Sequence, residues 1–83
     1  MKVIKKNEYG IIKLNLKKLM DDKNISISAM SRYAKIRYET VRKYYNNDCV
    51  WYDADSLAKF CYVLECNISD LLMLDEVKIV QNV

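Results

Sequence analysis

The sequence predicts an all-α domain of five short helices, with a small β element formed by its two ends. The chain has 83 residues, no proline and one glycine, so its organisation must come from apolar spacing and capping residues. Apolar residues recur three and four positions apart, and residues that cap helices precede most of these runs. At this length we expect one domain, 1–83, with a helical core over about 12–74 and strands or arms at 1–11 and 75–83.

Three helices are predicted in the first half of the core. The first covers about 16–23, and Asn15 can cap it. Ser26 offers a hydroxyl cap for the second helix, which ends at a break near residues 35 and 36. The third covers about 38–46.

The third helix separates apolar from polar residues. On a helical wheel Val41, Tyr44 and Tyr45 share one side, which we assign to the core. The opposite side carries the polar and basic residues Tyr38, Glu39, Arg42, Lys43 and Asn46. Asn47 follows and can adopt the left-handed conformation that often ends a helix.

Two more helices are predicted in the second half. Asp53 can cap a fourth helix over about 54–65. The spacing of Leu57, Cys61 and Leu64 in this helix places them in the core. Asn67 and Asp70 are spaced as a capping box for a fifth helix over about 68–74. The aromatic residues Trp51, Tyr52, Phe60 and Tyr62 are expected in the core or at a dimer contact.

The ends of the chain favour β-strands. β-branched residues alternate in "MKVI" or "YGIIKL" at the start and in "VKIV" near the end. The two segments can pair with each other. Such a pair also exposes an edge through which two copies of the chain could join, so we expect a homodimer.

Charge divides the chain into two unlike halves. Residues 1–47 carry twelve basic and four acidic residues, a net +8, whereas residues 48–83 carry two basic and seven acidic residues, a net −5. One half therefore suits a polyanion that the other half avoids. Basic residues that merely solvate helix faces would give the same asymmetry.

Residues 26–46 meet the requirements of a helix-turn-helix, which places its second helix in the DNA major groove. The motif needs a small residue where the helices cross, and Ser31 supplies it. It also needs an apolar residue in the turn, supplied by Ile36. Polar residues are needed on the first two turns of the reading helix, and these are Tyr38, Glu39, Arg42 and Lys43.

The segment "ISISAMSRYAKIRYETVRKYYNN", followed by "DADSLAKFCYVLECNISDLL", resembles the Cro/CI-type helix-turn-helix family, also called XRE. The resemblance covers about residues 12–74. It implies a five-helix, λ-repressor-like domain that binds double-stranded DNA as a dimer and regulates transcription, with repression expected. It also implies base contacts by Tyr38, Glu39, Arg42 and Lys43, and phosphate contacts by Ser26, Ser28, Arg37, Thr40 and Asn46.

The sequence departs from the family pattern at several positions. Lys35 stands where the turn usually has glycine, and a left-handed lysine costs roughly 1 kcal/mol. Ile27 replaces a frequent glutamine at the head of the second helix. Tyr45 and Met20 replace an ion pair that some relatives have. The alternative function is a protein-interaction module on the same fold, such as an antitoxin or anti-repressor, that no longer binds DNA.

Other classes of protein are not expected. The chain has no histidine, no glycine-rich phosphate loop and no paired carboxylate site, so we predict neither an enzyme nor a cofactor or small-molecule substrate. Three cysteines without CxxC spacing predict no metal site, and we interpret them as reduced thiols in the cytoplasm. No apolar run reaches the roughly 18 residues of a membrane span, so no membrane partner is expected.

Overall fold

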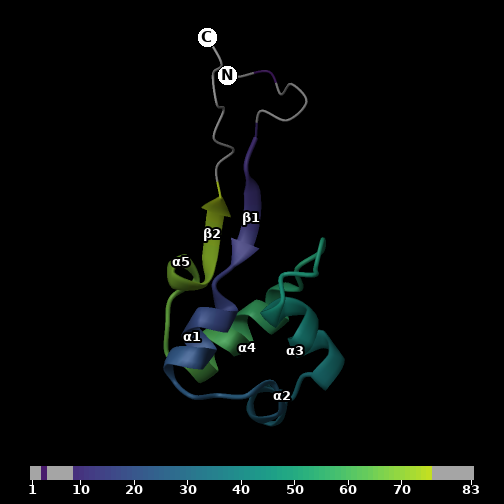
Figure 1. Cartoon of the computed structure of the whole chain (residues 1–83), viewed down its shortest axis with the longest axis vertical. Helices are drawn as coiled ribbons and strands as arrows, with labels where there is room; N and C mark the ends of the chain where they lie inside the picture. The colour runs from purple at the N-terminus through teal and green to yellow at the C-terminus, as the bar shows by residue number, and fades with distance from the viewer. Residues whose placement is uncertain (1–2, 4–8, 76–83) are drawn as a thin grey trace.

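Helices form the body of the molecule, and a two-stranded antiparallel ribbon projects from it (Figure 1). This computed structural model describes residue 3 and residues 9–75. Within them the elements in chain order are β1 (Ile11–Leu14), α1 (Leu16–Asp22), α2 (Ile27–Ala34), α3 (Tyr38–Tyr45), α4 (Ala54–Leu64), α5 (Ile68–Leu71) and β2 (Leu72–Asp75). The predicted five-helix fold with a small β element is confirmed.

The β element lies nearer the core than predicted. β1 falls within "YGIIKL", as expected, but β2 takes the residues that we assigned to the end of the fifth helix. That helix ends at Leu71 because Leu72 turns to extended backbone, with φ −97° and ψ 135°, and pairs with Leu14 across the ribbon. The prediction of a helix to residue 74 was therefore wrong. The segment "VKIV", and "MKVI" apart from Val3, lie outside the described residues.

The helix ends otherwise follow the predicted caps. Ser26 Oγ accepts the Ala29 N–H at 3.0 Å, and an Asp53 carboxylate oxygen accepts the Ser56 N–H at 3.1 Å. Asp70 reaches back to the Asn67 N–H at 3.0 Å, as in a capping box. Asn15 makes no side-chain cap; its main-chain N–H instead donates to Leu71 O at 2.7 Å and joins the ribbon to α5.

The two faces of the ribbon differ in polarity. One face carries only apolar side chains, from Ile12, Leu14, Leu72 and Leu74, whereas the other carries the ion pair between Lys13 and Asp75. Leu14 is buried in the core, but Ile12 and Leu74 are 49% and 57% exposed. The apolar face therefore continues beyond the helices that cover its inner end.

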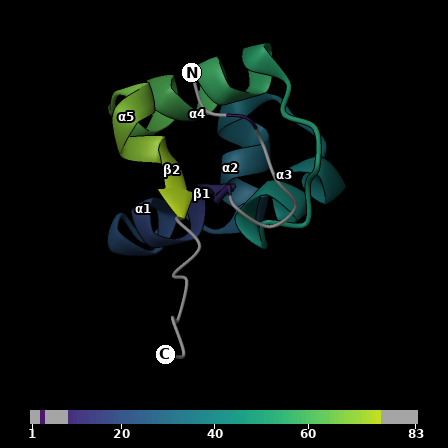
Figure 2. The same cartoon turned by 90° about the horizontal axis from the view of Figure 1, so that it is seen from above.

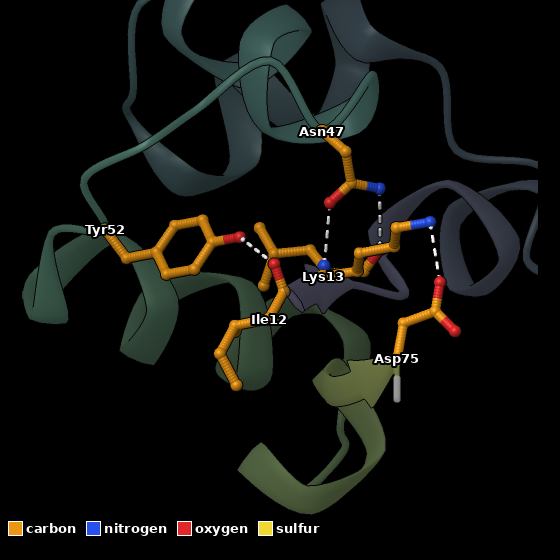
Figure 3. A network of polar contacts seen from close by, with 6 residues as sticks. Ile12, Lys13, Asn47, Tyr52 and Asp75 are labelled. Carbon is orange, nitrogen blue, oxygen red and sulfur yellow. Dashed lines mark hydrogen bonds and ion pairs between the residues drawn. The ribbon is translucent and has the colours of Figure 1, made fainter. Parts of the chain in front are cut away.

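The loop after α3 forms hydrogen bonds with the edge of β1 that does not pair with β2 (Figure 3). The Asn47 amide accepts the Leu14 N–H at 2.7 Å and donates to the Leu14 carbonyl at 3.0 Å. Tyr52 donates its hydroxyl to the carbonyl of Ile12 at 3.1 Å. Asn47 has a left-handed backbone, with φ 58°, as the sequence predicts. These bonds replace a third strand and fix the ribbon to the helical body.

Tyr44 connects α3 to the rest of the core. Its ring packs edge-on against Phe60 with centroids 5.3 Å apart, and lies beside the Tyr52 ring at 6.0 Å. Its buried hydroxyl accepts the Asp53 N–H at 2.8 Å, so it keeps a hydrogen-bond partner. Val41 and Tyr44 are buried as predicted, whereas Tyr45 is half-buried.

The buried face of α4 is rotated from the predicted one. Ser56, Phe60 and Leu64 face the core at i, i+4 spacing, while Leu57 and Cys61 are only half-buried. On this face Phe60 packs edge-on against the Tyr44 ring of α3, and Asp53 accepts the Ser56 hydroxyl at the start of the helix. Phe60 is a core residue as expected, but Trp51 and Tyr62 are 88% and 86% exposed and do not belong to the core.

We expect Asn47→Gly to lower the free energy of unfolding by roughly 1–3 kcal/mol, because it leaves the backbone groups of Leu14 without their partner. Glycine retains the left-handed conformation, so the loss reports the side chain alone. Urea unfolding measures it. Asn46→Gly, at the exposed helix cap next to it, is the matched control and should cost less than about 1 kcal/mol. An equal loss in both variants would contradict the role of the amide.

Candidate nucleic-acid interface

The turn between α2 and α3 sets the angle at which α3 is presented. Lys35 ends α2 in the left-handed conformation, with φ 55° and ψ 47°, although it is not glycine. Ile36 donates its N–H to Ser31 O at 3.1 Å and accepts the Ser31 hydroxyl on its carbonyl. Ser31 is thus the small residue at the crossing, and half-buried Ile36 packs against the core. These bonds offset the roughly 1 kcal/mol cost of a left-handed lysine.

The outer face of α3 is polar and open to solvent. Tyr38, Glu39 and Lys43 are exposed, and Arg42 lies half-buried between them. Asn46, at the end of the helix, is exposed as well. Helical spacing places these five predicted residues on the side opposite Val41 and Tyr44. The structure therefore brings the four predicted base-contact residues together on one surface.

Glu39 and Arg42 form an ion pair one turn apart on this surface. Arg42 donates from Nε at 3.0 Å and also from Nη2 to the same carboxylate oxygen. These hydrogen bonds lower the pKa of Glu39 and raise the pKa of Arg42, so both groups are charged at neutral pH. The acid fixes the guanidinium along α3 and compensates part of its charge. Lys43 has no such partner among the described residues.

The predicted phosphate contacts lie at different places. Ser26 and Ser28 are exposed at the start of α2, where helix amides without partners favour an anion. The Ser26 oxygen already accepts the Ala29 N–H, so only its hydroxyl hydrogen remains for a phosphate. Arg37 is exposed at the N-cap of α3. Thr40 is half-buried and lies off the open face, so it is the least accessible residue of this set.

Sequence reasoning missed the contacts that position α3 against α1. The Tyr45 hydroxyl donates to Asp21 Oδ1 at 2.8 Å, which raises the tyrosine's pKa. Lys17 Nζ lies 5.9 Å from the centre of the same ring. Met20, the other residue of the replaced ion pair, is fully buried in the core cluster against which Tyr45 packs. No local pattern signals a contact between residues 24 positions apart.

A helix-turn-helix with an open, polar second helix is thus present, and comparison with known proteins agrees. A profile of the Cro/C1-type HTH DNA-binding domain matches residues 15–76, most of the chain. This chain belongs to the Cro/C1-type helix-turn-helix family. The family is one of DNA-binding domains, so double-stranded DNA is the partner that this membership supports.

Structural comparison places the Cro/C1-type chain beside a protein of the same fold. The crystal structure of a candidate DNA-binding protein from Bacteroides fragilis superposes with a TM-score of 0.68 at 14% sequence identity. The match covers 76% of this chain and all of that protein. At this identity it shows the fold alone. No curated protein matches the sequence.

Two further observations bear on the expected classes of site. Within residues 3 and 9–75, no helix is both long and apolar enough to cross a membrane. Over the same residues, no cluster of three or more side chains of metal-ligating type is present.

We expect Glu39→Gln to tighten binding to random-sequence DNA by about three- to tenfold at low salt, because it removes a negative charge from the face that is predicted to meet DNA and frees Arg42. Fluorescence anisotropy of a labelled duplex measures the change. Glu65→Gln removes the same charge from the far end of α4 and should change affinity by less than about twofold. Equal tightening by both variants would show that net charge alone matters.

Proposed function

We propose that this Cro/C1-type domain is a homodimeric transcriptional regulator of the cytoplasm that recognises a specific DNA sequence and represses the genes beside it. The observation that carries the proposal is the open face of α3, where Tyr38, Glu39, Arg42 and Lys43 stand together at the exposed side of the helix-turn-helix. A helix with such a face fits the major groove, where the edges of the base pairs are exposed.

The polar groups on this face divide into two functions. Lys43, Arg37 and the serines at the start of α2 supply charge and hydrogen-bond donors for phosphates, which provide affinity on any sequence. Arg42 and Glu39 supply a donor and an acceptor at fixed separation. An arginine suits the O6 and N7 of guanine, and a carboxylate suits the N4 of cytosine. We therefore expect the pair to read a step that contains G·C.

Charge supports the same orientation on DNA. The exposed lysine and arginine residues of α2 and α3 belong to the half of the chain with net charge +8. The half with net charge −5 begins at Asp48. Phosphates attract the first half and repel the second. α3 would therefore face the duplex while α5 points away from it. The ribbon combines β1 from the basic half with β2 from the acidic half, and Figure 1 shows it on the side of the helices opposite α2.

Dimerisation is proposed through the ribbon. One edge of β1 pairs with β2, and its other edge bonds to Asn47 and Tyr52. Another strand could therefore add to the ribbon only at the edge of β2 that faces away from β1. The exposed apolar side chains of Ile12 and Leu74 lie on one face of the ribbon, and Leu74 belongs to the strand with the open edge. A second copy would cover both. Two copies would then need to hold their α3 helices about 34 Å apart, one turn of DNA, on an approximately palindromic operator.

Repression follows from the geometry that we propose. A dimer on its operator covers the major groove and the phosphates beside it, so it excludes other proteins from that stretch of DNA. The alternative, a protein-binding module, would depend on exposed apolar residues such as Tyr38, Val50 and Trp51 rather than on basic ones. Charge reversal on α3 separates the two functions.

The double variant Arg42→Glu/Lys43→Glu should weaken DNA binding by about two orders of magnitude at low salt, because it replaces two attractive charges with repulsive ones at the phosphates. Anisotropy titrations with a labelled duplex over a range of salt concentrations measure it. The wild-type affinity should fall steeply as salt rises.

A matched pair of single variants provides the control. Lys43→Glu and Lys59→Glu change the net charge equally, but Lys59 lies on α4 in an ion pair with Asp55, outside the helix-turn-helix. Only Lys43→Glu should weaken binding, by about tenfold. Flat anisotropy for the folded wild-type protein at every salt concentration would exclude DNA as its partner.

The dimer makes a separate prediction. Leu74→Glu should raise the dimer dissociation constant at least about tenfold, since it buries a charge in the proposed contact. Met73→Glu puts the same carboxylate on the opposite face, across from Lys13, and should leave the dimer intact. Sedimentation at micromolar concentration measures both. A monomeric wild-type protein, or equal effects of the two variants, would refute the ribbon contact.

A further inference from the structure

The C-terminus of α4 brings two cysteines together through its backbone. Glu65 adopts the left-handed conformation, with φ 52°, and donates its N–H to Tyr62 O at 3.3 Å. Cys66 then donates its N–H to Cys61 O at 3.0 Å. This is a Schellman motif, in which the side chains that flank the turn come into contact. In this chain those two side chains are thiols.

The backbone geometry limits how far apart the two residues lie. A carbonyl oxygen is about 2.4 Å from its own Cα, and an amide nitrogen about 1.5 Å from its own, so the bond from Cys66 to Cys61 keeps their Cα atoms within roughly 7 Å. Native disulfides join Cα atoms over about the same range. The spacing of the two Cα atoms is therefore compatible with a bridge.

Both thiols are accessible from one cavity. Cys61 and Cys66 are half-buried and line a hollow of about 590 Å³ between the end of α4 and the start of α5. A small reagent can therefore reach them. Cys49, the third cysteine, lies on the loop between α3 and α4 and does not line this hollow. The chain thus contains its own control for thiol reactivity.

We propose that Cys61 and Cys66 are a modification site that closes to an intramolecular disulfide in the presence of a low-molecular-weight disulfide such as oxidised glutathione. One deprotonated thiol attacks a glutathione sulfur, forms a mixed disulfide and releases one glutathione thiolate, which takes up a proton. The second protein thiol, on losing its own proton, attacks the protein-bound sulfur and releases the second glutathione. The two cysteines are oxidised, and one glutathione disulfide is reduced to two thiols.

The surroundings make this reaction slow at neutral pH and faster in base. Partial burial raises the pKa of Cys66, and contact with Cys61 raises it further, so little of the reactive thiolate is present. The acid Asp70 acts in the same direction, whereas Lys23 lowers the pKa. The second step is favoured because the attacking sulfur is already in place.

The site lies away from the DNA-binding face. α5, which follows the end of α4, lies on one side of the helical body, whereas α3 lies on the other (Figures 1 and 2). The bridge would close the turn at the end of α4, which precedes α5, and includes no residue of α3. We therefore expect the oxidised protein to bind random DNA within about twofold of the reduced protein.

Mass spectrometry of the full-length protein tests the proposal. The reduced protein is incubated with excess oxidised glutathione, free thiols are alkylated, and peptides are mapped. The expected result is a protein that has lost two hydrogen atoms, with Cys61 linked to Cys66, and that reducing agent restores. Cys49 should carry the alkyl group or glutathione. Raising the pH from 7 to 8.5 should speed closure at least about fivefold.

Single variants separate closure from simple thiol reactivity. Cys49→Ser should close as the wild type does, whereas Cys66→Ser should stop at a stable glutathione adduct on Cys61, and Cys61→Ser at one on Cys66. The proposal is overturned if the wild-type protein retains glutathione on either residue without closing, if Cys49 joins the bridge, or if neither thiol reacts. Circular dichroism of each variant confirms that it is folded before the reaction is compared.

Discussion

The position of α3 depends on the burial of one side chain, Tyr44. Its ring fills the space between Phe60 and Tyr52, and its hydroxyl accepts the N–H of Asp53, the residue that caps α4. A single residue of α3 thus joins the core and the start of the next helix. Because α3 has only eight residues, this anchor and buried Val41 fix which side of it faces solvent. The polar face follows from that constraint.

The loop after α3 also fixes the position of the ribbon relative to α3. Asn47 and Tyr52 flank the exposed tip at Val50 and Trp51, and both bond to β1. The loop that follows α3 is therefore joined by hydrogen bonds to β1, a strand of the ribbon that we propose as the dimer contact. A shift of the ribbon would move Asn47, and with it the end of α3, because both hydrogen bonds of the Asn47 amide go to β1. This connection is the physical basis for expecting dimer geometry and DNA geometry to depend on each other.

The ion pair between Glu39 and Arg42 on α3 would affect the affinity for DNA and the selectivity among DNA sequences in opposite directions. An acid in a surface that meets phosphates weakens binding to DNA of any sequence, yet it holds Arg42 in one direction. Lys43, one position further, supplies charge without such a restraint. A protein whose purpose was only to bind polyanions would not need Glu39. In the proposed complex with DNA, the pair would therefore favour recognition of particular base pairs over tight binding to any duplex.

The sequence by itself determined the helices, most of their caps and the polar face of α3, because these depend on spacing and on residues a few positions apart. It also identified the left-handed Asn47 from its residue type. Tertiary structure alone decided the rest. Leu72 is strand rather than helix because it pairs with Leu14, and α4 turns Phe60 inward, where its ring packs against Tyr44 of α3. Such contacts join distant segments or compete with local preference, so no local pattern contains them.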